Sequence, residues 1–231
     1  MRLLCIAAFA AGTAFAGQAS AAVNLLANGS FETGDFTGWT YAGLTPLGAP
    51  AVIIPYNSGA SYPGGAFGEP IPPDDTVSGS PDVVGNNAAY FVADGATESL
   101  SQSVFLDVGV YTIGFSVYVP FNGFNNSGNA TFMGSVAGVD LANFTVDGST
   151  PGEWVHYDGL ANIAVAGNYD TSFTYLSGPA PAGDFVVDRA YIVAGDVTGG
   201  VPEPGTWALM ILGFGGAGAS LRISRRRTAL A

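Results

Sequence analysis

The sequence predicts an all-β protein body, a β-sandwich or barrel, followed by one C-terminal transmembrane helix. Three observations carry this prediction: alternating apolar runs, turn signals between them, and an uncharged run near the C-terminus that is followed by arginines. In residues 111–119 every odd position holds a large apolar side chain, so one face of this run is expected to be buried. Many short strands at regular spacing in one domain are typical of a sandwich or barrel.

The other expected strands are short apolar or alternating runs. They are Val52–Ile54, Ala88–Ala93, Leu100–Leu106, Ala130–Val136, Leu141–Val146, Trp154–Tyr157, Tyr169–Leu176 and Phe185–Val193. Pairs that end in glycine predict the turns. These pairs are Asp94–Gly95, Asn122–Gly123, Ser127–Gly128, Asp147–Gly148 and Asp158–Gly159. No amphipathic helix is expected between residues 22 and 200.

A short motif, Gly-x-Tyr-x-x-x-Phe, occurs at residues 109–115 and again at 167–173. In both copies a turn glycine leads into a strand whose aromatic side chains are expected to face inward. The motif therefore predicts equivalent strands in two halves of a sandwich, and it is too short and isolated to indicate a solenoid repeat.

The N-terminus has the pattern of a secretory signal peptide, assigned to residues 1–21. Arg2 precedes an apolar run, and small residues follow it. Cleavage is expected after Ala19-Ser20-Ala21, with Ala14-Phe15-Ala16 as the alternative. A lone arginine indicates the general secretion machinery. The only cysteine, Cys5, would leave with this peptide, so the mature chain would have no disulfide and no thiolate metal site.

The C-terminal tail has three parts. Pro202 and Pro204 keep the peptide before them extended, which suits a protease cleft. Gly205–Leu221 carries no charge and would span about 26 Å as a helix, near the lower limit for a bilayer core. Trp207 suits one membrane interface, and the arginines that follow the run suit the cytoplasmic side. The alternatives are a buried core helix and a glycolipid-anchor signal, but tails of the latter kind end in hydrophobic rather than basic residues.

This tail resembles the PEP-CTERM sorting domain in its PEPxxWA subclass. The resemblance covers residues 201–227 and rests on one set of residues: Pro202, Glu203, Pro204, Trp207, Ala208, Arg222, Arg225, Arg226 and Arg227. It implies a bacterial protein that is exported, held in the inner membrane, and processed near Pro-Glu-Pro by an exosortase for the cell surface or extracellular matrix. The chain then divides into a signal peptide (1–21), an ectodomain (22–200) and a sorting domain (201–231).

The ectodomain is strongly acidic. Residues 22–201 hold 17 Asp and Glu residues against one basic residue, Arg189, for a net charge of −16. Nucleic acid and anionic polymers need cationic partners, so they are excluded as ligands. Divalent cations and neutral glycans remain compatible. The alternative is that the acidity only keeps a secreted protein soluble.

Parts of the ectodomain resemble the galactose-binding-like jelly rolls, a group that includes many carbohydrate-binding modules. The segments concerned are 24–39, Leu100–Val104 with the following Gly109–Tyr111, and Phe185–Ile192. The resemblance implies a jelly-roll β-sandwich whose opening strand lies in 24–39. It also implies a structural calcium held by Glu32 and Asp188, and two carboxylates with backbone carbonyls suit that ion. Arg189 stands where many relatives have a second acid, so a salt bridge or cap is the alternative.

Glycan binding requires exposed aromatic rings beside polar side chains. The candidates in the Gly/Pro-rich stretch 56–87 are Tyr56, Tyr62 and Phe67. Phe121 and Phe124 are the candidates beside Asn122, Asn125 and Asn126. Trp39 is expected in the core. Long irregular loops on sandwiches often carry binding functions, although this one could be merely flexible.

The sequence does not favour an enzyme. His156 is the only histidine, there is no Gly-x-Ser-x-Gly motif, and a lone strand histidine is usually structural. We therefore expect a non-catalytic module that binds exopolysaccharide of a biofilm matrix. A structural matrix protein without a defined ligand is the alternative, followed by a glycan-active hydrolase.

Overall fold

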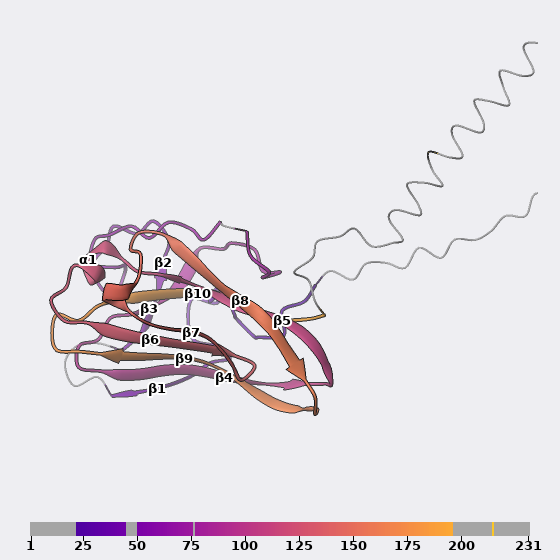
Figure 1. The fold of residues 1–231 in the computed structure, drawn as a ribbon. Coiled ribbons are helices and arrows are strands. Elements are labelled where there is room, and N and C mark those ends of the chain that lie inside the picture. The colour runs from indigo at the N-terminus through magenta and orange to yellow at the C-terminus, as the bar shows by residue number, and fades with distance from the viewer. Residues whose placement is uncertain (1–21, 45–49, 76, 196–213, 215–231) are drawn as a thin grey trace, which may run out of the picture. The chain divides into compact units, whose positions relative to one another are not determined.

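A computed structural model of the chain describes residues 22–44, 50–75, 77–195 and Phe214, and in it two five-stranded antiparallel sheets pack face to face (Figure 1). One sheet has the order β1 (Thr40–Leu44), β4 (Thr97–Leu106), β9 (Gly167–Ser177), β6 (Ala130–Val136) and β7 (Val139–Thr145). The other has the order β2 (Val52–Pro55), β3 (Asn87–Phe91), β10 (Phe185–Ala194), β5 (Gly109–Tyr118) and β8 (Trp154–Ile163). The predicted all-β jelly-roll sandwich is confirmed.

Each expected strand is present, but one of the turn assignments is wrong and two of the turns are helical. Asp158 and Gly159 lie within β8, because β8 pairs with β5 without interruption and Gly159 lies opposite Ile113. Asn122–Gly123 belongs to the short helix α1 (Phe121–Phe124), and Asp147–Gly148 to a 3-10 turn, Val146–Gly148. The glycine signal is thus overridden by a long strand pairing at residues 158–159, whereas at the other two positions the chain does turn, in a helical conformation.

The opening segment is also different from the expectation. Residues 24–39 form turns rather than a strand, and the first strand, β1, begins at Thr40. The segment still pairs locally with β10, where Leu25 donates its N–H to the carbonyl of Ile192 (2.9 Å) and Ala190 donates to Gly29 (2.9 Å). These contacts join the first part of the domain to its last strand.

Aromatic rings fill the space between the sheets. Phe115 and Phe173 meet edge to face at 5.0 Å between centroids, and Phe132 lies 5.3 Å from Phe185. Trp39 is only 8% exposed and its ring lies 5.5 Å from that of Phe173, so its predicted core position is confirmed. Offset and edge-to-face pairs add to the apolar area that such rings bury.

The repeated Gly-x-Tyr-x-x-x-Phe motif forms the same local structure in both copies. Tyr111 donates its hydroxyl to the carbonyl of Asp107 (3.1 Å), and Tyr169 donates to Val165 (2.8 Å), in each case four residues upstream. The two phenylalanines face inward and touch, as predicted. The strands differ in position, however, because β9 is the central strand of its sheet and β5 is not.

The β2–β3 segment, residues 56–86, lies over the outside of the sheet that contains β10 (Figure 1). Side chains that β3, β5 and β10 direct outward are buried beneath it. They form a second hydrophobic cluster of Ile54, Ala66, Ile71, Ala88, Tyr90, Tyr118 and Val186. We call this side of the sandwich the covered face, and the outside of the β1-β4-β9-β6-β7 sheet the open face.

Within the described part of the chain no helix is long and apolar enough to cross a membrane. The signal peptide, the sorting residues Pro202 to Arg227 and the expected transmembrane segment fall outside it, apart from Phe214.

Candidate functional site

Phe67 lies at the tip of a tight turn in the β2–β3 segment. Glu69 donates its N–H to the carbonyl of Ala66 (3.0 Å), and the two residues between them, Phe67 and Gly68, have φ values of 48° and 90°. Two successive positive φ angles are the pattern of a type I′ turn. Glycine adopts this conformation freely, whereas a bulky residue such as phenylalanine rarely does. The turn therefore holds Phe67, which is 57% exposed, in a strained conformation.

The Phe67 turn is clamped to α1 by side-chain hydrogen bonds. The two carboxylate oxygens of Glu69 accept the N–H groups of Phe121 (2.9 Å) and Asn122 (2.8 Å), which are otherwise orphaned at the start of the helix. In return, the Asn122 amide donates to the carbonyl of Ala66 (2.7 Å). The turn and the helix are separated by more than fifty residues in sequence, yet they form one unit.

A cavity of about 270 Å³, here called the loop pocket, opens between four strand connections at this end of the sandwich. Its lining consists of Phe67, Val92, Asp94, Asn122, Asn126, Pro181, Ala182 and Asp184. Asp94 accepts the N–H of Ala182 (2.6 Å), and the Asn126 amide donates to the Ala182 carbonyl. The Asn122 side-chain oxygen is buried and accepts no hydrogen bond within the described structure.

Asp184 gives the loop pocket a carboxyl group with an unusual proton affinity. It is 3% exposed and accepts the hydroxyl of Tyr90 (2.6 Å). Burial raises the pKa of Asp184 to about 7, the Tyr90 hydrogen bond opposes this effect, and the charges of Asp94 and Glu69 add to it. Near neutral pH this group can therefore donate as well as accept a hydrogen bond.

The five predicted aromatic residues have different environments. Phe67 lines the loop pocket, and Tyr62 stacks on it with ring centroids 6.1 Å apart. Phe121 is 53% exposed at the start of α1, next to the pocket residue Asn122, whereas Phe124 packs partly against the core. Tyr56 instead directs its hydroxyl inward to Asp188. The structure thus brings Phe67 together with the predicted asparagines of the other connection.

Sequence reasoning missed Glu69, Asp94 and Asp184. Asp94 carried a turn signal alone, and the other two lie in irregular stretches without a motif. Only the fold brings these carboxylates to one end of the sandwich. The Phe-Gly-Glu order in 67–69 is the one signal that could have indicated a tight turn with an exposed ring.

The two predicted calcium ligands are held by separate contacts. Glu32 accepts the N–H groups of Asn86 and Asn87 (2.8 Å each). Its carboxyl group packs against Gly85, where an added Cβ would lie 2.2 Å from the carboxyl carbon, so only glycine leaves room for it. Asp188 is fully buried and accepts the hydroxyl of Tyr56, while its second oxygen has no hydrogen-bond partner. A buried carboxylate oxygen that accepts no hydrogen bond from the described residues suits a calcium ligand.

Burial and neighbouring acidic groups disfavour the charged form of Asp188. Burial raises the pKa of Asp188 well above its ordinary value, and the charges of Asp74 and Glu32 add to this effect. Hydrogen bonds from the Tyr56 hydroxyl and the backbone N–H of Arg189 oppose it. Arg189, in a β-bulge with φ of 51°, pairs with Asp74 instead: its guanidinium donates to the Asp74 carbonyl (3.0 Å) and lies 3.9 Å from the carboxylate. Across the described ranges no group of three or more His, Cys, Asp or Glu side chains is arranged for a metal ion.

His156 lies in a chain of polar contacts beneath the β2–β3 segment. Its Nδ1 is 2.7 Å from the Ser116 hydroxyl and its Nε2 is 3.4 Å from an Asp74 carboxylate oxygen. In serine hydrolases the serine hydrogen-bonds to Nε2 and the carboxylate to Nδ1. Here the order is reversed and Ser116 is fully buried, so the arrangement ties the covering segment to the sheet rather than presenting a nucleophile.

Comparisons with known proteins gave one family match, which confirms the predicted tail. Residues 200–227 match the PEP-CTERM protein-sorting motif. A comparison with curated proteins found no match.

Solved structures that resemble the body include carbohydrate-binding modules, as predicted. TmCBM61 in complex with beta-1,4-galactotriose is 21% identical, with 75% of this chain and 99% of that chain covered and a TM-score of 0.43. Carbohydrate-binding module 2 of family 16 is 15% identical, with 74% of this chain and 99% of that chain covered and a TM-score of 0.40. The K3 adhesin domain of Lys-gingipain from Porphyromonas gingivalis is 14% identical, with 75% and 99% covered and a TM-score of 0.46.

Proposed function

We propose that this chain is an exported cell-surface or extracellular-matrix protein whose β-sandwich binds a polysaccharide in the loop pocket, without catalysis. The observation that carries the proposal is the strained, exposed Phe67 beside convergent amide and carboxyl groups. Backbone strain in an exposed side chain is typical of functional sites, because packing alone gives no reason to maintain it.

A sugar unit matches the chemistry of the loop pocket. Its C–H face packs on an aromatic ring, which Phe67 offers, and its hydroxyls need donors and acceptors. Asn122 offers a buried acceptor that no protein group uses, and Asp184 offers a carboxyl that can be protonated near pH 7. A volume of about 270 Å³ is at the lower end for small-ligand pockets, which favours one sugar unit of a longer chain.

The rigidity of the Phe67 turn supports binding by reducing its entropic cost. Glu69 and Asn122 fix the turn to α1, and Tyr62 stacks on the ring, so little side-chain freedom is lost when a ligand arrives. The lining contains two carboxyl groups and no basic side chain, within a body of net charge −16. Neutral polysaccharides are therefore favoured over uronates and sulfated chains.

The sorting motif supports the export part of the proposal. After transport by the general secretion machinery, Gly205–Leu221 would hold the precursor in the membrane, with the arginines on the cytoplasmic side. An exosortase-type enzyme would then process the extended peptide at Pro202–Pro204. The mature ectodomain would remain at the cell surface or in the matrix.

A structural calcium ion remains part of the proposal. Asp188, with its partnerless oxygen, and Glu32 would be its carboxylate ligands. Arg189 does not take that place, because its guanidinium pairs with Asp74. Calcium would offset the cost of a buried charge and link the first segment of the domain to β10.

The test is the affinity of the purified ectodomain for neutral polysaccharides, measured by pull-down and calorimetry. Phe67→Gly should lose at least tenfold in affinity while keeping or raising the melting temperature, because glycine relieves the positive φ. Phe105→Gly, at an exposed phenylalanine far from the pocket, is the matched control and should bind as the wild type does. Equal affinity in the wild type and Phe67→Gly would place the binding surface outside the loop pocket. No binding to any polysaccharide would favour the structural matrix protein instead.

A further inference from the structure

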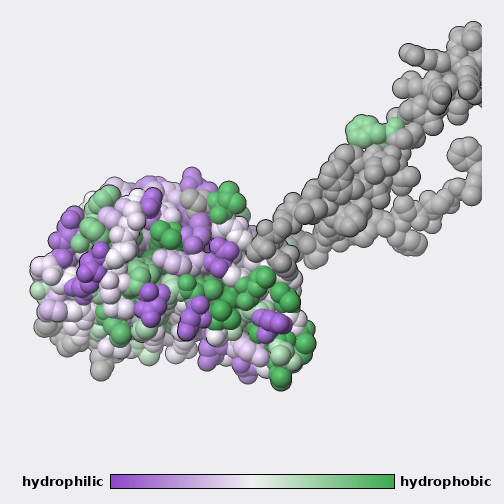
Figure 2. Space-filling model, viewed as in Figure 1, coloured by the Kyte–Doolittle hydropathy of each residue, from purple (hydrophilic) through white to green (hydrophobic). Residues whose placement is uncertain are grey.

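One end of the sandwich carries a concentration of exposed apolar side chains, here called the hairpin end. Figure 2 shows hydrophobic surface gathered at this end of the body. Its large apolar residues are Phe105 (61% exposed), Val108, Val110, Leu160 and Val165. Exposed apolar side chains are ordinary when scattered, but a contiguous group indicates an interaction surface.

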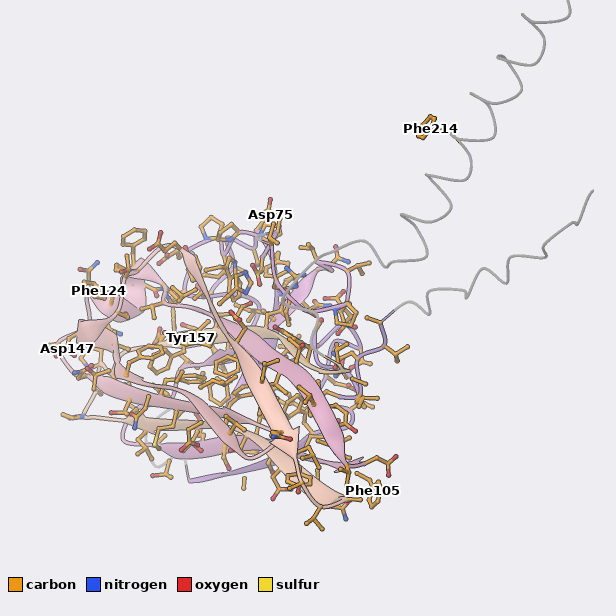
Figure 3. The ribbon with its side chains drawn as sticks, turned by 45° about the vertical axis from the view of Figure 1, so that its right-hand side comes forward. Asp75, Phe105, Phe124, Asp147, Tyr157 and Phe214 are labelled. Carbon is orange, nitrogen blue, oxygen red and sulfur yellow. The ribbon has the colours of Figure 1, made fainter. Side chains whose placement is uncertain are left out.

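Strand pairing explains why these residues are together. Val108 lies in the turn between β4 and β5, and Val165 in the turn between β8 and β9. Since β5 pairs with β8 and β4 pairs with β9, the two turns are neighbours at one end. Both turns cross from one sheet to the other, so together they close this end of the sandwich. Phe105 lies at its tip in Figure 3, far from Phe124 near the loop pocket.

The chain leaves the body at the same place. Gly195, the last described residue of the body, donates its N–H to the carbonyl of Val110 (2.8 Å), and Thr112 donates to the Gly195 carbonyl (3.0 Å). Nine residues, 196–204, then separate this point from the uncharged run Gly205–Leu221. A linker of that length reaches at most about 30 Å, which is less than the diameter of about 40 Å expected for a compact domain of this size.

We infer that the hairpin end rests on the lipid bilayer while the precursor is tethered, with the apolar side chains of the two turns inserted between lipid headgroups. The inference rests on the membrane tether of the proposed function. The short linker keeps the hairpin end at an effective concentration on the order of millimolar or higher at the bilayer surface. Insertion removes apolar area from water, as in other peripheral membrane contacts.

The net charge of the ectodomain favours the bilayer over a second copy of the chain as the partner of the hairpin end. Two ectodomains that each carry −16 repel one another, whereas a zwitterionic bilayer carries no net charge. Arg189, the only basic residue of the mature body, is buried and pairs with Asp74, so no basic side chain at the hairpin end attracts anionic lipid. The contact is therefore apolar, and anionic lipid should weaken it.

Docking would also orient the protein. β5 begins at the hairpin end at Gly109 and ends at Tyr118, just before α1. The loop pocket is thus at the opposite end of the sandwich. A precursor with its hairpin end on the bilayer would present the loop pocket away from the membrane, where polysaccharide is accessible.

The test uses the precursor that remains after removal of the signal peptide, residues 22–231, reconstituted in phosphatidylcholine nanodiscs. A spin label is placed at Val108→Cys or, as a control, at the exposed Ser127→Cys beside α1. Accessibility to oxygen, which partitions into lipid, is compared with accessibility to a water-soluble nickel complex. We expect at least a fivefold higher ratio of oxygen to nickel accessibility at residue 108 than at residue 127. The triple variant Phe105→Ser, Leu160→Ser, Val165→Ser should abolish this difference. Nanodiscs that contain one third phosphatidylglycerol should reduce it.

Three results would overturn the inference. Equal water accessibility at residues 108 and 127, in precursor that co-purifies with the nanodisc, would contradict the docking and leave the tether intact. Dipolar broadening between labels at residue 108 on different chains would show a second copy at the hairpin end. Precursor that does not co-purify with the nanodisc would contradict the tether, and with it both this inference and the export part of the proposed function.

Discussion

The covered face and the open face are built from similar strands but have opposite side-chain environments. On the covered face, outward side chains of β5 and β10 are buried under the β2–β3 segment, and they include Ser116, Asp188 and Tyr191. On the open face, outward side chains of β4, β6 and β9 remain partly or fully exposed, and most of them are small and polar, with Phe105, Met133 and Leu176 as the large apolar exceptions. The same sheet architecture therefore carries a second hydrophobic core on its covered side and a solvent-exposed surface on its open side.

A row of hydroxyl groups crosses the open face. Ser101 lies opposite Ser172, which in turn lies opposite Ser135, and the hydroxyls of the last two are 3.0 Å apart. A cavity of about 240 Å³ lies on this face, but its lining contains no aromatic ring. This cavity offers no aromatic ring for a sugar to pack on, whereas the loop pocket offers Phe67. The loop pocket depends on the covered face, because the β2–β3 segment supplies its Phe67.

The largest expected effect is on the covered face, at Arg189. Arg189→Met should lower the free energy of unfolding by about 3–5 kcal/mol, because it removes the guanidinium from the buried Asp74 carboxylate, which keeps its contact with His156. Urea denaturation of the ectodomain measures this. Arg189→Lys is the control for charge and should recover part of the loss. A loss below 1 kcal/mol for Arg189→Met would show that the charges beneath the β2–β3 segment do not hold it in place.

The second prediction is a pH dependence from Asp184. Its pKa is raised from 3.8 to about 7 in the folded state, so the folded state binds this proton more tightly than the unfolded state does. The stabilisation is complete below the unfolded pKa and is lost as pH rises through about 7. At about 1.4 kcal/mol per pKa unit, the loss is about 2–4 kcal/mol between pH 4 and pH 8.

Asp184→Asn tests this origin, because asparagine does not titrate. Burial also raises the pKa of Glu98 and, well above its ordinary value, that of Asp188, so some pH dependence of the same sign should remain in the variant. Unfolding free energies are compared for both proteins at pH 4, 6 and 8. Parallel curves for the wild type and Asp184→Asn would show that Asp184 does not titrate abnormally.

The third prediction concerns calcium at the edge of the covered face. A ligand that binds only the folded state at one hundred times its Kd adds about 2.7 kcal/mol, which corresponds to several degrees in Tm for a domain of this size. The ectodomain should therefore melt several degrees higher in millimolar calcium than in chelator. Asp188→Asn should remove most of the difference. Identical melting curves, with no metal found by elemental analysis, would remove the calcium site.

The smallest effect is expected on the open face. Ser101→Ala and Ser172→Ala should each change the free energy of unfolding by no more than about 0.5 kcal/mol, since neither hydroxyl is fully buried. Both variants should also bind polysaccharide as the wild type does. A loss of affinity in either variant would move the binding surface from the loop pocket to the open face.

The sequence was sufficient for the strands, because alternation such as that of Tyr111, Ile113 and Phe115 reflects burial on one face directly. It was insufficient for turns such as Asp158–Gly159, where the pairing of β8 with β5 decides the conformation. β1 was missed because Thr40–Leu44 has no clear alternation and forms a strand only through its pairing with β4.

The candidate site could be predicted only in part. Phe67 was identified from its aromatic ring in a Gly/Pro-rich stretch. Its helix partner Asn122, and the Asp184 carboxyl in the same pocket, come from connections far away in the chain. In the same way, Arg189 finds its partner 115 residues away, in a segment whose sequence gives no sign that it covers a sheet.

The most direct test of the account is to map the bound polysaccharide by heteronuclear NMR of the ectodomain during titration with a neutral oligosaccharide that pull-down has identified. The account predicts that the amide shifts which change most cluster at residues 66–69, 94 and 121–126, and that those of Ser101, Ser135 and Ser172 stay constant. Changes concentrated on the open face, or none at saturating ligand, would contradict the claim that the loop pocket is the binding site.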